Sequence, residues 1–126
     1  AYQGQFESLR PLVFRTMGYR IQRYPKGEGQ FIWHCDATSP ATYNRQVALV
    51  LYLNSLTAGG ETEFSYQDIR ISPQQGCCIF FPPFWTHRHR GAVPLSDDKF
   101  VITSFFERVT GEMDGVGGGD CSDSPP

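Results

Sequence analysis

The segment FIWHCDATSPATYNRQVALVLYLN, residues 31–54, contains two apolar runs separated by a polar stretch rich in turn-forming residues. Side chains alternate between the two faces of a β-strand, so His34 and Asp36 are expected on one face and Trp33 and Cys35 on the other. An imidazole and a carboxylate two residues apart therefore point at the same place. Such a pair supplies two ligands of a metal site, although the same spacing is also common by chance.

Further segments share the composition of strands, being rich in β-branched and aromatic residues and bounded by turn residues. The expected strands lie at residues 19–24, 30–37, 45–54, 62–72, 76–82 and 99–109. Many strands and little helix predict an all-β core, built as an antiparallel sandwich or barrel. We expect residues 47–53 and 77–81 to be fully buried, whereas residues 66–72 alternate and should have one solvated face.

The two ends of the chain differ from this core. Near the N-terminus, apolar residues recur at helical spacing: Phe6, Leu9, Val13 and Met17. Pro11 fits only near a helix start, so a short N-terminal helix is expected to begin around Ser8. Residues 109–126 carry too few apolar groups to offset the entropy of ordering them. The sequence therefore predicts one domain, residues 1–108, followed by a flexible, acidic, Gly-rich tail, residues 109–126.

The charge of the chain disfavours nucleic acid as a partner. The net charge is −2, and the tail contributes −4 of it through Glu112, Asp114, Asp120 and Asp123, with no Lys or Arg. The remaining body is therefore about +2, which is too weak for the basic surface of a protein that binds duplexes.

Cysteine usage and hydropathy bear on the compartment. The chain has four cysteines, Cys35, Cys77, Cys78 and Cys121, and none forms a C-x-x-C pair. This pattern disfavours a zinc knuckle or a disulfide framework and favours reduced thiols. No apolar run approaches the roughly 18 residues of a membrane span, and no signal-peptide pattern opens the chain. A cytoplasmic, reducing location without membrane contact is expected.

Two further histidines, His87 and His89, offer a third ligand to the His34–Asp36 pair. Two imidazoles and one carboxylate on a facial triangle are typical of non-haem Fe(II) oxygenases, because three adjacent coordination positions stay open for co-substrate and O₂. His87 and His89 are two residues apart, so on an extended chain both could face the metal side. The residues alone leave this choice open. The strand that follows carries Lys99, and Thr103 shares a strand face with it.

Several short motifs together resemble a known family. The motifs are YPKGEGQFIWHCD (24–36), RQVALVLYLN (45–54), GGETEF (59–64), PQQGCCIFFP (73–82) and HRGAVPLSDDK (89–99). In this order they resemble the Fe(II)/2-oxoglutarate dioxygenases of the prolyl 4-hydroxylase-like branch, over residues 19–108 or about 70% of the chain. The resemblance implies a double-stranded β-helix, or jelly roll, in agreement with the strand pattern.

The resemblance also implies roles for individual residues. His34, Asp36 and His89 would hold the iron; the ten-residue spacing from His89 to Lys99 favours it over His87. Lys99 would pair with the distal carboxylate of 2-oxoglutarate, since a buried ammonium needs an opposite charge.

Other residues match positions around the co-substrate and the substrate entrance. Tyr24 and Tyr52 match phenols near the co-substrate, and Thr103 is expected to line the same pocket as Lys99. Arg45 matches an arginine near the substrate entrance. For the two tyrosines the alternative is an ordinary core role, and for Arg45 an ordinary surface charge.

The implied activity is oxidation of an unactivated C–H bond to an alcohol, coupled to conversion of 2-oxoglutarate and O₂ into succinate and CO₂. Fe(II), 2-oxoglutarate and O₂ are the implied cofactors and co-substrates, and ascorbate is compatible with them. The resemblance favours a prolyl residue in a peptide or protein, or a free amino acid, as substrate. Two alternatives stay open: a cupin-like metal enzyme without 2-oxoglutarate, and a non-catalytic jelly-roll binding module. The first would leave Lys99 without a role.

Overall fold

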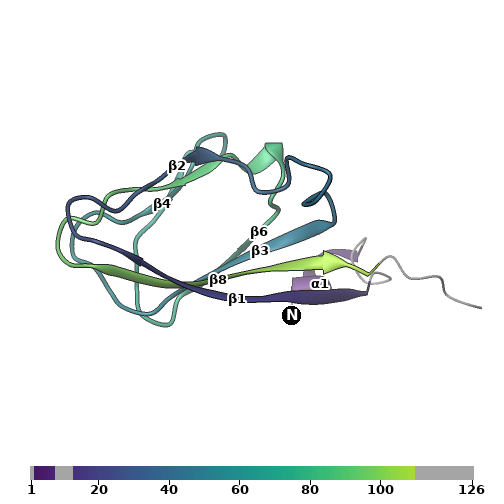
Figure 1. Ribbon diagram of the computed structural model, residues 1–126, viewed down its shortest axis with the longest axis horizontal. Coiled ribbons are helices and arrows are strands. Elements are labelled where there is room, and N and C mark those ends of the chain that lie inside the picture. The colour runs from purple at the N-terminus through teal and green to yellow at the C-terminus, as the bar shows by residue number, and fades with distance from the viewer. Residues whose placement is uncertain (1, 8–12, 110–126) are drawn as a thin grey trace, which may run out of the picture.

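The computed structural model describes residues 2–7 and 13–109. Two four-stranded antiparallel sheets face each other (Figure 1). One sheet has the order β1-β8-β3-β6, formed by Phe14–Tyr24, Lys99–Arg108, Arg45–Tyr52 and Cys78–Phe81. The other has the order β2-β7-β4-β5, formed by Phe31–His34, His89–Gly91, Thr62–Phe64 and Ile69–Ile71. Two short helices complete the described part, α1 (Tyr2–Gln5) and the 3₁₀-helix η2 (Trp85–His87).

The chain crosses between the sheets after every strand of the described part except β4, so that strands distant in sequence become neighbours. The first and last strands, β1 and β8, lie side by side along most of their length (Figure 1). The crossings and the two antiparallel sheets form a jelly-roll-like, all-β fold, as the sequence predicted. The core between the sheets consists of Ala48, Tyr52, Phe64, Ile79, Phe81 and Val101.

The prediction of a short N-terminal helix beginning around Ser8 is wrong for residues 14–17, which the structure describes. Residues 8–12 lie outside the described residues, and Phe14 to Met17 already belong to β1. Phe14 pairs with Arg108 of β8, and long-range strand pairing here overrides the local helical spacing. The register shifts between Thr16 and Tyr19, where Gly18 adopts a φ of 89°. The α-helix α1, Tyr2–Gln5, has four residues and ends before the predicted start at Ser8.

Two other strand predictions need correction. Residues 62–72 form a hairpin rather than one strand, because residues 65–68 turn between β4 and β5, with Asp68 at a φ of 52°. Residues 77–81 are not fully buried. Along β6, Ile79 and Phe81 face the core, while Cys78 is exposed and Phe80 is 40% exposed. β6 is an edge strand whose outer face stays in contact with solvent.

Other expectations have mixed outcomes. Within residues 47–53, Val47, Ala48 and Tyr52 are buried and the remaining positions are half-buried. Cys35, Cys77 and Cys78 are free thiols, as expected. Cys121 and the predicted tail from residue 110 onward lie outside the described residues. In the part that the structure covers, no helix is long and apolar enough to cross a membrane.

Candidate metal and co-substrate site

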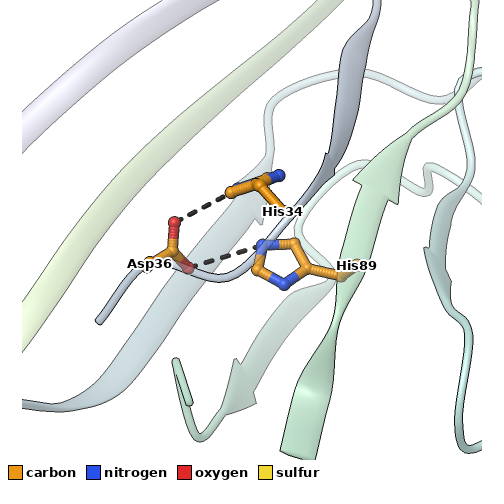
Figure 2. A group of neighbouring side chains, drawn as sticks. All are labelled: His34, Asp36 and His89. Atoms are coloured by element: carbon orange, nitrogen blue, oxygen red, sulfur yellow. Dashed lines mark ion pairs between the residues drawn. The ribbon is translucent and has the colours of Figure 1, made fainter. Parts of the chain in front are cut away.

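Strand pairing brings together the residues of the predicted metal site. His34 ends β2 and pairs directly with His89, which begins the neighbouring strand β7. Asp36 follows β2 by two residues, and its backbone N–H donates to the carbonyl of Pro83 at 3.0 Å. That hydrogen bond holds the turn after β2 so that the carboxylate lies beside both imidazoles (Figure 2).

The three side chains form a compact group. His34 Nε2 lies 3.2 Å from Asp36 Oδ1, and His89 Nε2 lies 3.4 Å from Asp36 Oδ2. One ligand atom from each residue lies within 4.8 Å of the other two. His89 is buried, and His34 and Asp36 are half-buried, so a cation bound here would be partly shielded from water.

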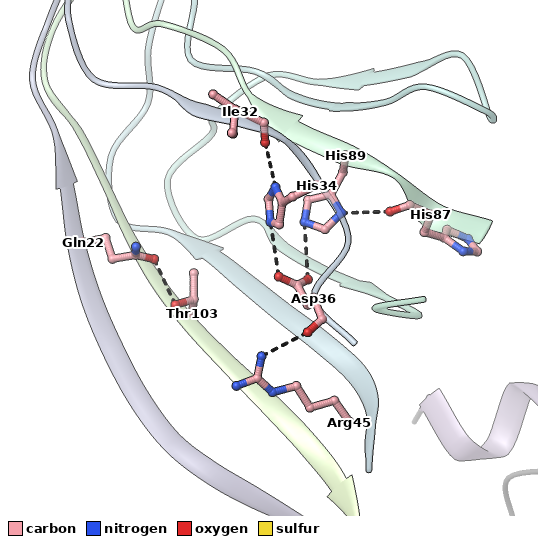
Figure 3. A network of polar contacts seen from close by, with 8 residues as sticks. All are labelled: Gln22, Ile32, His34, Asp36, Arg45, His87, His89 and Thr103. Carbon is pink, nitrogen blue, oxygen red and sulfur yellow. Dashed lines mark hydrogen bonds and ion pairs between the residues drawn. The ribbon is translucent and has the colours of Figure 1, made fainter. Parts of the chain in front are cut away.

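Backbone carbonyls fix the orientation of both imidazoles. His34 Nδ1 contacts the carbonyl oxygen of Ile32 at 2.7 Å, and His89 Nδ1 contacts that of His87 at 2.8 Å (Figure 3). A carbonyl only accepts hydrogen bonds, so each Nδ1 carries the proton and, in the neutral ring, each Nε2 keeps its lone pair. Both lone pairs then face the space beside Asp36. This support of the ligand rings is common in metal sites.

The two histidine pKa values move in opposite directions. Burial lowers the pKa of His89, and the hydrogen bond to the His87 carbonyl only partly offsets this effect. Burial also lowers the pKa of His34, but its hydrogen bonds to Asp36 and Ile32 outweigh it, so the net pKa is raised. Neutral imidazoles and a carboxylate form the donor set that suits Fe(II).

The structure separates His89 from His87. The ring of His87 points away from the group of His34, Asp36 and His89 (Figure 3). Its Nδ1 contacts Thr86 Oγ1 at 2.9 Å, and its ring lies edge-on to Phe64. η2 breaks the extended conformation before β7, so the two histidines do not share one face. His87 contributes its backbone carbonyl to His89, not its imidazole.

A buried lysine lies in the same region. Lys99 is 3% exposed, and its Nζ donates to the Gly60 carbonyl at 2.9 Å and lies 4.6 Å from the ring centroid of Tyr24. Across residues 2–7 and 13–109, no carboxylate lies within 4.0 Å of this ammonium. Burial therefore lowers the pKa of Lys99 to about 8, and the charge of Glu61 offsets only part of this effect.

A single cavity of about 260 Å³ contains both features. Its lining includes the predicted metal ligands and Lys99, together with Tyr24, Phe31, Thr62, Gly91, Val101, Thr103 and Phe105. A Cβ atom added to Gly91 would lie 3.4 Å from Lys99 Nζ, so the glycine keeps the space beside the ammonium open. The cavity thus offers a metal-binding group and a separate cation that lacks a carboxylate partner. This arrangement fits a ligand with two carboxylates, one bound at each end.

The model of the 2OG-Fe(II) oxygenase superfamily matches residues 19–107. The chain belongs to this superfamily. Its cofactors are Fe(II), 2-oxoglutarate and O₂, and the donor set and the buried ammonium fit the metal and the dicarboxylate. No curated protein sequence matches the chain.

Solved structures share the fold of this oxygenase. A viral collagen prolyl hydroxylase from Paramecium Bursaria Chlorella virus-1 has a TM-score of 0.68 at 23% identity, with 86% of this chain and 71% of that chain covered. A Pseudomonas putida prolyl-4-hydroxylase has a TM-score of 0.61 at 22% identity (86% and 64% covered). A Trichoplax adhaerens prolyl hydroxylase, solved with a hypoxia inducible factor peptide fragment, has a TM-score of 0.67 at 19% identity (79% and 47% covered). The oxygenase chain thus spans between about half and 71% of these three.

Tyr24 and Thr103 both line the cavity of the oxygenase. Tyr24 lies under the Lys99 ammonium, and burial raises the pKa of its phenol. Thr103 Oγ1 donates to Gln22 Oε1 at 3.0 Å, on the sheet opposite the histidines (Figure 3). The sequence interpretation missed Gln22, although alternation along β1 places it on the same face as Tyr24.

Tyr52 occupies a different place from Tyr24. It is fully buried in the core and is not among the residues that line the cavity. Its hydroxyl contacts Thr62 Oγ1 at 2.6 Å and donates to the Ile71 carbonyl at 3.3 Å. Thr62 does line the cavity, so Tyr52 positions a wall residue from behind. Thr62 was also missed, although it lies within the GGETEF motif.

Arg45 lies next to the predicted metal ligands. Its Nη1 donates to the Asp36 carbonyl at 3.4 Å, and its guanidinium lies 3.9 Å from the ring centroid of Phe105 (Figure 3). Its Nε is buried and has no hydrogen-bond partner within the described part of the chain. Arg45 is therefore not an ordinary surface charge, because it lines the cavity and its Nε is buried.

Proposed function

We propose that this oxygenase hydroxylates a prolyl residue of a peptide or protein, using Fe(II), 2-oxoglutarate and O₂. The observation that carries the proposal is the shared cavity, which has His34, Asp36 and His89 in one region and the buried Lys99 in another. Either feature alone has an ordinary explanation. A metal-ligand triad and a buried ammonium without a carboxylate in one cavity favour a chelated dicarboxylate.

In this proposal His34 Nε2, His89 Nε2 and Asp36 hold Fe(II), and Lys99 pairs with the distal carboxylate of 2-oxoglutarate. When bound, the metal and the co-substrate convert O₂ and 2-oxoglutarate into succinate, CO₂ and one oxygen atom that is inserted into a substrate C–H bond. The protein orients these groups. The carbonyls of Ile32 and His87 hold the imidazoles with Nε2 toward the metal position.

Other cavity residues limit water and set the polarity of the walls. Phe31, Phe81 and Phe105 supply apolar surface. A dry environment strengthens electrostatic contacts such as the one proposed for Lys99. Thr103 donates its hydroxyl proton to Gln22 Oε1, so this donor does not need water as a partner.

The prolyl substrate is supported by the three fold relatives described above, all of which are prolyl hydroxylases. A cupin-like enzyme without 2-oxoglutarate would leave Lys99 buried and charged with no carboxylate to offset it. A non-catalytic binding module would not require the two Nε2 lone pairs to converge beside a carboxylate. The geometry therefore favours the oxygenase over both alternatives.

The decisive assay is succinate formation from 2-oxoglutarate by the purified protein, with and without Fe(II) and proline-containing peptides. We expect Fe(II)-dependent succinate release that proline peptides stimulate, with a mass increase of one oxygen in the peptide. Binding of Fe(II) without any succinate would contradict the proposal. A crystal with Mn(II) and the inert analogue N-oxalylglycine tests the residue roles directly, since the analogue should contact Lys99.

A further inference from the structure

The face of β1 that lines the cavity carries an unexplained cation, Arg20. Arg20, Gln22 and Tyr24 alternate onto one side of the strand, and all three line the cavity. Tyr24 contacts Lys99 and Gln22 contacts Thr103, so two of the three have partners within the cavity wall. The exposed Arg20 lies at the solvent end of this row.

The two neighbouring arginines of β1 already have carboxylate partners. Arg23 Nη2 lies 2.7 Å from Asp98, and Arg15 Nη2 lies 3.9 Å from Glu107. For Arg20, no carboxylate lies within 4.0 Å in residues 2–7 and 13–109. The positive charge of Arg20 also acts on a residue of the cavity wall. It lowers the pKa of the Tyr24 phenol, although burial has the larger effect and raises it.

Arg45 adds a second cation to the same wall. Its guanidinium covers the Phe105 ring, and its buried Nε lacks a partner in the described structure. Arg20 pairs across β1 and β8 with Thr103, which is two residues from Phe105 and therefore about 7 Å away along the strand. Arg20 and the Arg45 guanidinium thus border one short stretch of β8, from Thr103 to Phe105.

The bound metal and co-substrate would not neutralise these two arginines. Fe(II) and Lys99 together carry three positive charges, and Asp36 and 2-oxoglutarate carry three negative charges. Asp36 is the only carboxylate that lines the cavity in the part of the chain that the structure describes. Arg90 also borders the cavity, but its guanidinium pairs with Glu63 and lies over the Trp33 ring. Glu107 pairs with Arg45 in the register of β3 and β8, but it does not line the cavity and its ion pair is with Arg15. Arg20 and Arg45 therefore have no carboxylate within 4.0 Å among the described residues, and a substrate carboxylate could offset them.

We infer that the substrate is an acidic peptide, in which an Asp or Glu beside the oxidised residue places its carboxylate between Arg20 and Arg45. This inference rests on the proposed function for the location of the reaction. A carboxylate accepts charge-assisted hydrogen bonds from guanidinium groups, whereas an amide of the same shape offers only a neutral acceptor. The arginines would thus select the sequence around the target residue.

Paired fluorescent peptides test the inference on the protein loaded with Mn(II) and N-oxalylglycine. One peptide contains Gly-Asp-Pro-Glu-Gly, and the other is its amide counterpart Gly-Asn-Pro-Gln-Gly. We expect the acidic peptide to bind about tenfold more tightly at low salt, by fluorescence anisotropy, and to lose much of this advantage at about 1 M salt. Equal affinity of the two peptides would overturn the inference, as would failure of both to bind.

Variants of Arg20 test whether this residue causes the preference for the acidic peptide. Arg20→Gln should reduce the acidic-over-amide ratio by about threefold, the range of an exposed ion pair. Arg20→Glu should reduce it further, and Arg20→Lys should retain most of it. The matched control is Arg23→Gln, which removes the same charge from the opposite face of β1 and should leave the ratio unchanged. A ratio that responds equally to Arg20→Gln and Arg23→Gln would contradict a specific contact.

Succinate release without peptide separates this inference from the proposed function. Succinate formation together with equal peptide binding would overturn the acidic-peptide inference and keep the oxygenase activity. Preferential binding of the acidic peptide without any succinate formation would overturn the proposed oxygenase activity and support the selectivity for acidic peptides.

Discussion

Replacement of Lys99 by Met should make the protein more stable and abolish its response to 2-oxoglutarate. Burial lowers the pKa of Lys99 from 10.5 to about 8. At about 1.4 kcal/mol per pKa unit, keeping this lysine charged costs roughly 3 kcal/mol of folding free energy at neutral pH. The hydrogen bond to Gly60 and the contact with the Tyr24 ring each offset about 1 kcal/mol of this cost.

The net effect of Lys99→Met is a gain of about 1 kcal/mol in the free energy of unfolding at pH 7, or about 3 °C in Tm for a domain of this size. Methionine has a similar length and packs well in irregular apolar space. Thermal unfolding of the Mn(II)-loaded protein, with and without 2-oxoglutarate, measures both effects. The wild type should gain about 2.7 kcal/mol at a 2-oxoglutarate concentration about 100 times Kd, and the variant should gain none.

The stability difference between Lys99→Met and the wild type should change with pH in a defined direction. Between about pH 8 and pH 10.5 the unfolded chain keeps the Lys99 proton while the folded protein has lost it. Loss of this proton therefore stabilises the wild type by up to roughly 3 kcal/mol as the pH rises through this window, so the advantage of about 1 kcal/mol of Lys99→Met should shrink and then reverse. Below pH 8 the advantage should be constant.

The matched control is Lys26→Met, since Lys26 is the only other lysine and lies on the surface. It should change neither Tm nor the effect of 2-oxoglutarate. The reasoning is refuted if Lys99→Met lowers Tm at pH 7 and still responds to 2-oxoglutarate like the wild type. Lys99 would then be an ordinary structural lysine.

Three further predictions concern the same cavity. His89→Ala should weaken Mn(II) binding by at least about tenfold in calorimetry, whereas His87→Ala should retain the metal, because only the His87 carbonyl supports His89; equal losses would contradict the assignment. Gly91→Val should abolish stabilisation by 2-oxoglutarate but spare Mn(II) binding, because its side chain would occupy the space beside Lys99 Nζ; an unchanged response would place the co-substrate elsewhere. The affinity for 2-oxoglutarate should be constant below about pH 8 and fall by about tenfold per pH unit above it, as Lys99 loses its proton; a flat profile up to pH 10 would exclude an ammonium contact.

Much of the site could be predicted from the sequence because it depends on local geometry. Alternation along one strand places His34 and Asp36 on one face, and the order of the motifs indicates that His89 and Lys99 belong to the same site. The same alternation would have found Gln22 beside Tyr24. The inferences for His34, Asp36 and Gln22 need only the two-residue period of a strand, whereas those for His89 and Lys99 also need the resemblance to the family.

Other features depended on contacts between distant segments. Phe14 to Met17 have helical spacing but pair with β8, and Phe80 is apolar but lies on the exposed face of an edge strand. The sequence places His87 and His89 two residues apart, and only η2 shows that their rings diverge. Tyr52 matches a family position, yet the register of β3 turns it toward the core, behind Thr62. The sequence by itself determined the order of the motifs along the chain and the types of residue that these motifs bring to the site. The tertiary structure decided which side of each element faces the cavity, because strand register and turn conformation are set by partners far away in the sequence.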